Sequence, residues 1–189
     1  MDVQHFNVKV FVADPSAVHM EAFTGIFNSW IQRQVSEGEL LVDVADYLHV
    51  PAGPGIVLVG HQANYGLDNE RNRLGLLYNR KATVEGSNQD RIRQAVRAAL
   101  TASRRLEQEN QLQFSGQELQ VMVNDRLLAP NSEESYSALK PDLQAVFDQL
   151  YGAGAYTMER QQADPRERLT INVRAAAPAS VADLLTRLG

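Results

Sequence analysis

Asp46 and His61 are the two side chains whose types and spacing best fit acid–base chemistry. All four histidines (His5, His19, His49 and His61) fall in the first third of the chain, so the search for reactive groups narrows to that region. An imidazole held beside a carboxylate can take up or release a proton near neutral pH. This pair is therefore the candidate catalytic centre.

A hairpin would have to bring these two groups together. The β-rich runs Leu40–Val50 and Ile56–Tyr65 flank the segment 51–54, which is rich in Pro and Gly and is typical of a turn. A regular hairpin makes Asp46 and His61 diagonal neighbours on one face of the ribbon. Apolar or aromatic side chains supply the rest of that face: Val42, Leu48, Val57, Ala63 and Tyr65.

The regular register places Asp46 opposite Val59, and Val44 opposite His61. A carboxylate on an apolar face costs several kcal/mol unless it is paired, so we expect an Asp46–His61 hydrogen bond. Such a pair also has a structural interpretation, because it can simply maintain strand register. A one-residue bulge would reverse the faces and separate the two groups.

A basic segment follows the hairpin. Between Arg71 and Arg105 nine Lys or Arg residues accompany only Glu85 and Asp90. Guanidinium groups suit phosphate or carboxylate ligands, although a solvated helix face is the alternative interpretation. In an enzyme, Tyr65 or Arg80 would stabilise developing charge. The candidate binding residues are Tyr65, Arg73, Arg80, Arg93 and Arg97.

Other reactive constellations are missing from the sequence. His49 with Asp43 lacks the spacing of a metal-binding motif, so we expect no metal site. The chain has no Cys, no Gly-x-Ser-x-Gly elbow and no phosphate-binding loop at Gly53–Gly55. We therefore expect no cofactor, and a nucleophilic enzyme is disfavoured.

Composition limits the class of protein. The 189 residues are 44% hydrophobic and 22% charged, which is typical of a globular protein. A net charge of −5 disfavours nucleic acid as a partner. No apolar run approaches the roughly 18 residues of a membrane span, and the N-terminal residues do not resemble a signal peptide. These features predict a cytoplasmic location.

Hydrophobic periodicity predicts an α+β fold with antiparallel sheets packed by helices. A helix is expected after Asp14-Pro15, with its apolar stripe at Phe23, Ile26, Phe27, Trp30 and Ile31. The other expected helices are Asn88–Glu109, one starting at Pro141, and Val181–Leu188. The expected strands outside the hairpin are Phe6–Val12 (buried on both faces), Leu74–Lys81, Glu118–Asn124, Ala155–Arg160 and Leu169–Val173, with a turn at Ala163-Asp164-Pro165.

The two halves of the chain share a pattern. Val8–Asp14 matches Leu119–Asp125 at an offset of 111, and the same offset sets Leu169–Asn172 on Leu58–His61. This pattern predicts two related modules, 1–112 (β-α-β-β-β-α) and 113–189 (β-α-β-β-α), either separate or joined in one domain. A ligand cleft is then expected on the pseudo-two-fold axis. The topology resembles the duplicated modules of GyrI-like small-molecule-sensing domains.

A second resemblance covers roughly the first 80 residues. The segments FNSWIQ from Phe27, LLVDVADYLHVPAGPGIVLVGHQANYGLD from Leu40, and GLLYNRK ending at Lys81 are similar to a family of uncharacterised bacterial proteins. The resemblance implies a bacterial cytoplasmic setting and no particular activity.

Three functions fit these observations. The leading one is a non-catalytic module that binds a small anionic or aromatic ligand, or a partner, through the hairpin and the Arg71–Arg105 region. The second is an enzyme that uses Asp46 and His61. The third is a scaffold subunit of a homo-oligomer. We expect the protein to self-associate.

Overall fold

The strands of the described chain form one antiparallel sheet in the order β2-β3-β4-β5-β1-β6-β8-β7. The computed structural model describes residues 1–162, 164 and 166–189. The predicted turn at Ala163-Asp164-Pro165 therefore lies largely outside the described residues. The strands are β1 (Phe6–Val12), β2 (Leu41–Tyr47), β3 (Gly55–Gly60), β4 (Ala63–Asp68), β5 (Gly75–Arg80), β6 (Phe114–Val123), β7 (Tyr156–Arg160) and β8 (Leu169–Ala175).

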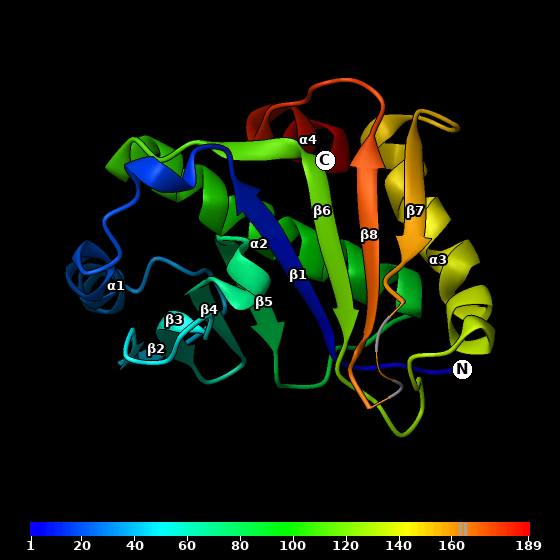
Figure 1. The fold of residues 1–189 in the computed structure, drawn as a ribbon, viewed down its shortest axis with the longest axis horizontal. Coiled ribbons are helices and arrows are strands. Elements are labelled where there is room, and N and C mark those ends of the chain that lie inside the picture. The colour runs from blue at the N-terminus through cyan, green and yellow to red at the C-terminus, as the bar shows by residue number, and fades with distance from the viewer. Residues whose placement is uncertain (163, 165) are drawn as a thin grey trace.

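Helices cover one face of this sheet (Figure 1). The long helix α2 contacts β1, β5 and β6 and also packs against α3 and α4, while α1 packs on β2. The hydrophobic core lies between these layers. The helical elements are η1 (Pro15–Ala17), α1 (Ala22–Arg33), η2 (Glu70–Asn72), α2 (Asn88–Asn110), α3 (Glu133–Tyr151) and α4 (Val181–Leu188).

The opposite face of the sheet has no helix over its central strands among the described elements (Figure 1). Alternation along each strand gives the two faces different chemistry. On β1, Val8 and Val10 face the helices and are fully buried, whereas Asn7 and Lys9 belong to the other face. We call this second surface the open face.

One transverse row of the open face can be followed through all eight strands by register. Each member is paired with the next across neighbouring strands. The row reads Ala45, Val57, Gly66, Leu77, Lys9, Gln120, Asn172 and Glu159. It is apolar over β2–β5 and polar over β1, β6, β8 and β7, so the open face is amphipathic from one side of the molecule to the other.

The predicted α+β class with an antiparallel sheet packed by helices is confirmed. The run Ile56–Tyr65 was predicted as one strand, but it forms β3 and β4 joined by a tight turn at His61 and Gln62. The helix expected directly after Pro15 begins at Ala22, because Pro15 starts only the short η1.

Pro141 does not start a helix, contrary to the prediction. Helix α3 begins two turns earlier, where the Ser132 side chain accepts a hydrogen bond from the Ser135 amide and caps the end. Glu133 and Glu134 follow in the first turn, where acidic side chains are favourable. The polar residues that follow Ser132 therefore form the first two turns of the helix.

The two segments that matched in sequence lie side by side at the centre of the sheet. Strands β1 and β6 pair antiparallel, with Lys9 opposite Gln120. The sequence offset of 111 also matches Lys9 with Gln120. A two-fold axis that relates the halves would therefore pass through this pair. The sheet runs without a break across the proposed boundary at residues 112–113. A common origin of the halves stays a prediction.

Among the described residues, no helix is both long and apolar enough to cross a bilayer.

Candidate functional site

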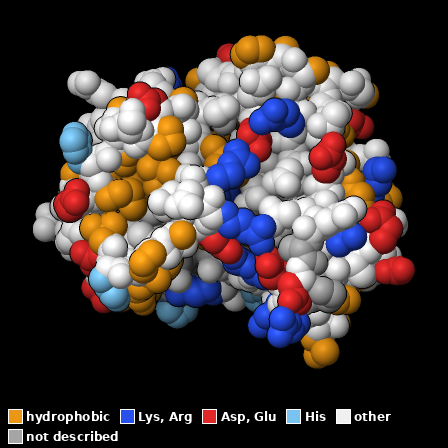
Figure 2. Space-filling view, in the orientation of Figure 1, with side chains coloured by type: hydrophobic (Ala, Val, Ile, Leu, Met, Phe, Trp, Pro, Cys, Tyr) orange, Lys and Arg blue, Asp and Glu red, His pale blue; other side chains and the backbone are white. Residues whose placement is uncertain are grey.

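A cleft of about 600 Å³ opens on the open face of the sheet. Figure 2 shows a band of Lys and Arg side chains, with a few acidic ones, running down the middle of this face. The cleft is lined by Lys9, Phe11, Glu70, Arg71, Arg73, Gln120, Met122, Asn124, Arg126, Gln161, Arg166, Glu167, Arg168, Thr170 and Asn172. We call this the open-face cleft.

Alternate residues of the three adjacent strands β1, β6 and β8 supply the floor. Lys9, Gln120 and Asn172 come from the transverse row, and Gln120 donates a hydrogen bond of 2.9 Å to the Asn172 side-chain oxygen. The residues between them, such as Leu119 and Ile171, are fully buried in the core. The floor is polar because helix packing requires apolar residues only on the other face of each strand.

The two walls come from opposite halves of the chain. Segment η2 forms one wall, and the other wall consists of residues that lie between β7 and β8, namely Gln161, Arg166, Glu167 and Arg168. Arg168 donates to Glu70 across the cleft at 3.1 Å, and Arg71 donates to Glu167 from the opposite wall. These pairs are about half exposed, so each contributes little to stability. Their geometry nevertheless holds guanidinium groups at the mouth of the cleft.

The lining carries an excess of positive charge in a chain that is negative as a whole. Six Lys or Arg residues line the cleft against two Glu residues, whereas the whole chain has a net charge of −5. Arg126 donates to the backbone carbonyl of Arg166 at 3.0 Å and has no carboxylate within ion-pair distance among the described residues. No carboxylate of the described residues therefore neutralises its charge.

Arg73 lies flat against the floor. Its guanidinium carbon is 3.8 Å from the centroid of the Phe11 ring, and it pairs with Glu118 at 2.9 Å. Burial of the Glu118 carboxyl works to raise its pKa, but hydrogen bonds from Arg73 and Arg174 hold that pKa below its usual value. Glu118 is thus a stable anion that orients Arg73.

A buried ion pair lies at the end of the floor. Lys9 and Asp68 contact each other with only 3% and 6% of their side chains exposed. The Lys9 side chain passes over Gly75, where an added Cβ would lie 3.0 Å from the Lys9 Cε atom. Burial lowers the pKa of the Lys9 ammonium below its usual value, and the Asp68 carboxylate opposes this shift.

The predicted register of the Asp46 hairpin is wrong. Asp46 pairs with Ile56 rather than Val59, because the connecting loop runs from residue 48 to residue 54 instead of from 51 to 54. Asp46 is exposed, and its Oδ1 atom accepts a hydrogen bond of 2.8 Å from the Leu48 amide. Its side chain thus stabilises the turn and does not contact an imidazole.

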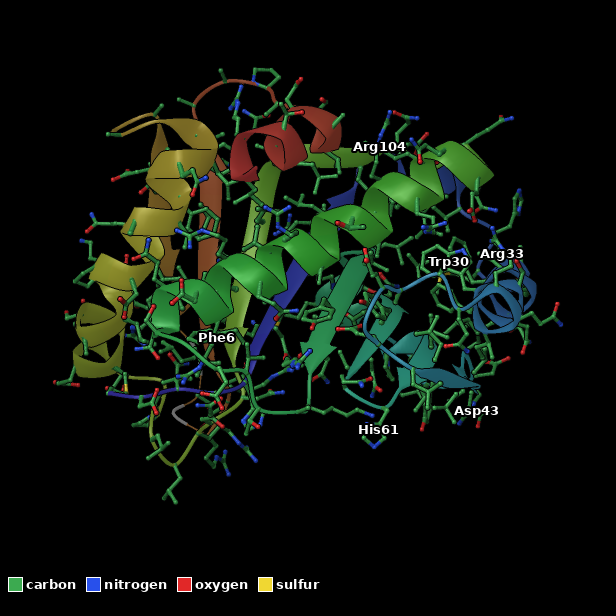
Figure 3. All side chains as sticks on the ribbon, turned by 180° about the vertical axis from the view of Figure 1, so that it is seen from behind. Phe6, Trp30, Arg33, Asp43, His61 and Arg104 are labelled. Carbon is green, nitrogen blue, oxygen red and sulfur yellow. The ribbon has the colours of Figure 1, made fainter. Side chains whose placement is uncertain are left out.

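His61 lies beyond the opposite end of the same hairpin. It occupies the β3–β4 turn next to Gly60, which pairs with Leu41. Five residues along β2 separate that pair from Asp46, which corresponds to about 17 Å. His61 is exposed at the rim of the molecule (Figure 3). The structure therefore does not bring the predicted catalytic residues together.

The predicted binding residues are divided among several places. Arg73 lines the open-face cleft. Tyr65 and Arg97 line a different pocket of about 360 Å³ on the helix side, between α2 and the segment after α1. Arg93 is paired with Asp90 on the surface of α2. Only Arg73 belongs to the cationic site.

Arg80 and Tyr65 belong to a hydrogen-bonded cluster around Glu39. Tyr65 donates to Glu39 at 2.6 Å, Tyr78 donates at 3.1 Å and Arg80 donates at 3.3 Å. Burial and the Glu39 charge raise the pKa of the Tyr65 hydroxyl above its usual value. This cluster satisfies its own charges, and its role here is to join β4 and β5 to the loop before β2.

Most cleft residues were missed by sequence reasoning, although a signal was present. Polar residues alternate with buried apolar ones at Asn7 and Lys9 of β1, and at Gln120 and Asn124 around β6. That period of two indicates a strand with one polar face. The run Phe6–Val12 was predicted to be buried on both faces, which is confirmed. The sequence reasoning did not use the polar side chains on one of those faces to locate a binding site.

A scan against protein-family models gives no match for this chain, and neither does a search of curated proteins. Within the described residues, no three His, Asp or Glu side chains are grouped as metal ligands would be. The candidate site is consequently assigned from its geometry alone.

Proposed function

We propose that this protein is a non-catalytic binding module and that its ligand is a small anion held in the open-face cleft. The observation that carries this proposal is the lining of six Lys or Arg and two Glu residues around a concave, polar floor. Guanidinium groups bind carboxylates and phosphates through charge-assisted hydrogen bonds, which are among the stronger polar contacts.

The ion pairs at the mouth support the same ligand class. A ligand carboxylate can replace Glu70 or Glu167 as the partner of Arg168 or Arg71, because these pairs stand in solvent and are individually weak. Arg126 offers a further cation that the described protein leaves without a carboxylate. The floor amides of Gln120 and Asn172 add donors and acceptors for the rest of the ligand.

A thermal-shift titration with sodium citrate tests this function, with sodium chloride at matched ionic strength as the reference. A ligand that prefers the folded state raises the unfolding midpoint. We expect citrate to raise the midpoint beyond the chloride effect and Arg126→Gln to weaken citrate binding about tenfold. Arg104→Gln is the matched control, because Arg104 is partly exposed, pairs with Glu107 on α2 and does not line the cleft.

Two results would contradict the function. If citrate raises the unfolding midpoint no more than chloride does, the cleft does not bind an anion of this kind. Equal weakening by Arg126→Gln and Arg104→Gln would show that general surface charge, not the cleft, attracts citrate.

A second proposal concerns self-association. Strand β2 is the first strand of the sheet and has β3 as its one neighbour in the described chain. Leu40 directly before this strand and Val42 within it are 55% and 56% exposed, which is unusual for large apolar residues on an edge. We propose that a second copy of this chain pairs there. Light scattering should give a discrete dimer that Val42→Lys dissociates, and a wild-type monomer at high concentration would rule this out.

A further inference from the structure

A smaller pocket of about 260 Å³ lies on the open face beside the cleft, over β3, β4 and β5. Gly66 occupies its centre, with Val57 and Leu77 as its direct partners on the two neighbouring strands. A Cβ atom added at Gly66 would meet no atom closer than 3.6 Å. The chain therefore leaves space here that a side chain could fill, and Tyr47 borders that space.

Two contacts join the linings of this pocket and of the open-face cleft. Asp68 lines the pocket and pairs with Lys9, which lines the cleft. Asn79 lines the pocket and accepts a hydrogen bond of 3.3 Å from Asn124, which lines the cleft. One layer of side chains thus separates the two compartments, and a single molecule lying on this face can reach both.

The layer between the compartments is polar and incompletely paired. Asn7 lies on β1 between Asn79 and Met122 and is fully buried. Its Nδ2 atom has no hydrogen-bond partner among the described residues. A buried donor without a partner is costly, so this layer is a polar region whose hydrogen bonds are not all made within the described residues.

The polarity of the transverse row indicates which end of a ligand goes where. Its members over the small pocket are Val57, Gly66 and Leu77, and its members over the cleft are Lys9 and Gln120. Figure 2 shows hydrophobic side chains gathered on one side of the cationic band. Two strand spacings, or about 10 Å, separate Gly66 from Lys9.

We propose that the ligand is bipartite, with an anionic group in the open-face cleft and a flat apolar or aromatic group about 10 Å away over Gly66. This inference rests on the proposed function, since the anionic group is the one already assigned to the cleft. An apolar surface with a glycine floor accepts a ring by close contact, and the neighbouring cations exclude a purely apolar ligand as the preferred one.

Calorimetric titration with three probes tests this inference: 6-phenylhexanoate carries both groups, citrate carries only the anionic one, and 6-phenylhexanol carries only the apolar one. Gly66→Val fills the small pocket, and the free space at its Cβ position allows the fold to remain intact. Ala45→Val is the matched control, because Ala45 belongs to the same transverse row on β2 and lines neither compartment.

We expect 6-phenylhexanoate to bind wild type at least tenfold more tightly than 6-phenylhexanol. Gly66→Val should weaken 6-phenylhexanoate about tenfold and leave citrate unchanged, while Ala45→Val changes neither. Unchanged 6-phenylhexanoate binding in Gly66→Val, together with citrate binding that Arg126→Gln weakens, would overturn the bipartite ligand and leave the anion function standing. Failure of both anions to bind wild type would overturn the proposed function and this inference with it.

Discussion

Lys9 and Asp68 hold opposite charges in a place that water hardly reaches. Their side chains are almost fully buried, and Gly75 provides the space through which the lysine passes. A buried pair of this kind adds little net stability, but removal of one partner leaves an uncompensated charge. The pair is therefore a sensitive measure of whether the floor of the cleft is arranged as described.

Lys9→Met should lower the free energy of unfolding by about 3 to 5 kcal/mol, because Asp68 is then buried without its cation. The double variant Lys9→Met/Asp68→Asn removes both charges and should recover most of that loss. Urea unfolding of the two variants measures both values. A loss below about 1 kcal/mol for Lys9→Met would show that water reaches Asp68 freely.

Alanine substitution of two glycines on the open face, Gly75 and Gly66, should have different effects on the stability of the fold. A Cβ atom at Gly75 would lie 2.6 Å from the Val10 carbonyl oxygen, and backbone cannot easily give way, so Gly75→Ala should cost about 1 to 3 kcal/mol. Gly66→Ala meets only ordinary contacts and should be neutral or stabilising by up to about 1 kcal/mol. Thermal unfolding of the two variants compares them. Equal effects would contradict the close approach at Gly75.

Residue-level prediction from the sequence succeeded where it depended on alternation and failed where it depended on register. The stripe of α1 is largely buried at Phe23, Phe27 and Trp30, as predicted. The Asp46–His61 pairing required a symmetric turn, and register follows the full loop length, which the sequence does not reveal. Lys9, a single lysine within the apolar strand β1, indicated the candidate site better than the Asp46–His61 pair did.

At the scale of elements, α1 and α2 are tied together at their C-terminal ends. Glu109 of α2 accepts hydrogen bonds from the Trp30 indole at 3.0 Å and from Arg33 at 2.9 Å, and it also pairs with Arg105. Trp30 and Arg33 lie together beside the end of α2 (Figure 3). Hydrogen bonds from Arg33, reinforced by Trp30 and Arg105, lower the pKa of Glu109 from 4.5 to about 2.

This tie predicts a stability change at acidic pH. Because the Glu109 pKa is lower in the folded chain than in the unfolded one, the contribution is complete above pH 4.5 and is lost as the pH falls toward 2. Solvent screening limits it to about 1 to 2 kcal/mol. Urea unfolding of wild type and Glu109→Gln should give curves that converge over this range. A constant difference between them down to pH 2 would contradict the tie.

The ends of an element could be predicted from the sequence where the hydrophobic periodicity and the capping residues indicate the same boundary. Helix α2 was predicted to within one residue, and its Ser87 and Asp90 cap each other reciprocally. Helix α3 was not, because Pro141 reads as a start signal while tertiary packing of Leu139, Leu143 and Phe147 maintains a helix through it. Local signals and packing compete there, and packing prevails.

For the whole molecule, the amphipathic open face is the feature that sequence patterns could not provide. It requires the order β5-β1-β6-β8, which places strands from the two halves next to each other. The Lys9–Gln120 pairing puts the open-face cleft where the halves meet, and a cleft at such a position was the expectation. Its cations come from both halves, so neither half alone forms the proposed anion site.

Backbone-amide NMR during a citrate titration tests anion binding in the open-face cleft most directly, because it locates the ligand on the sheet. We predict chemical-shift changes that gather at Arg71, Gln120, Arg126 and Thr170 and are absent with sodium chloride at the same ionic strength. Changes gathered instead around Glu39 and Arg97 on the helix side, or no saturable change at all, would contradict the account.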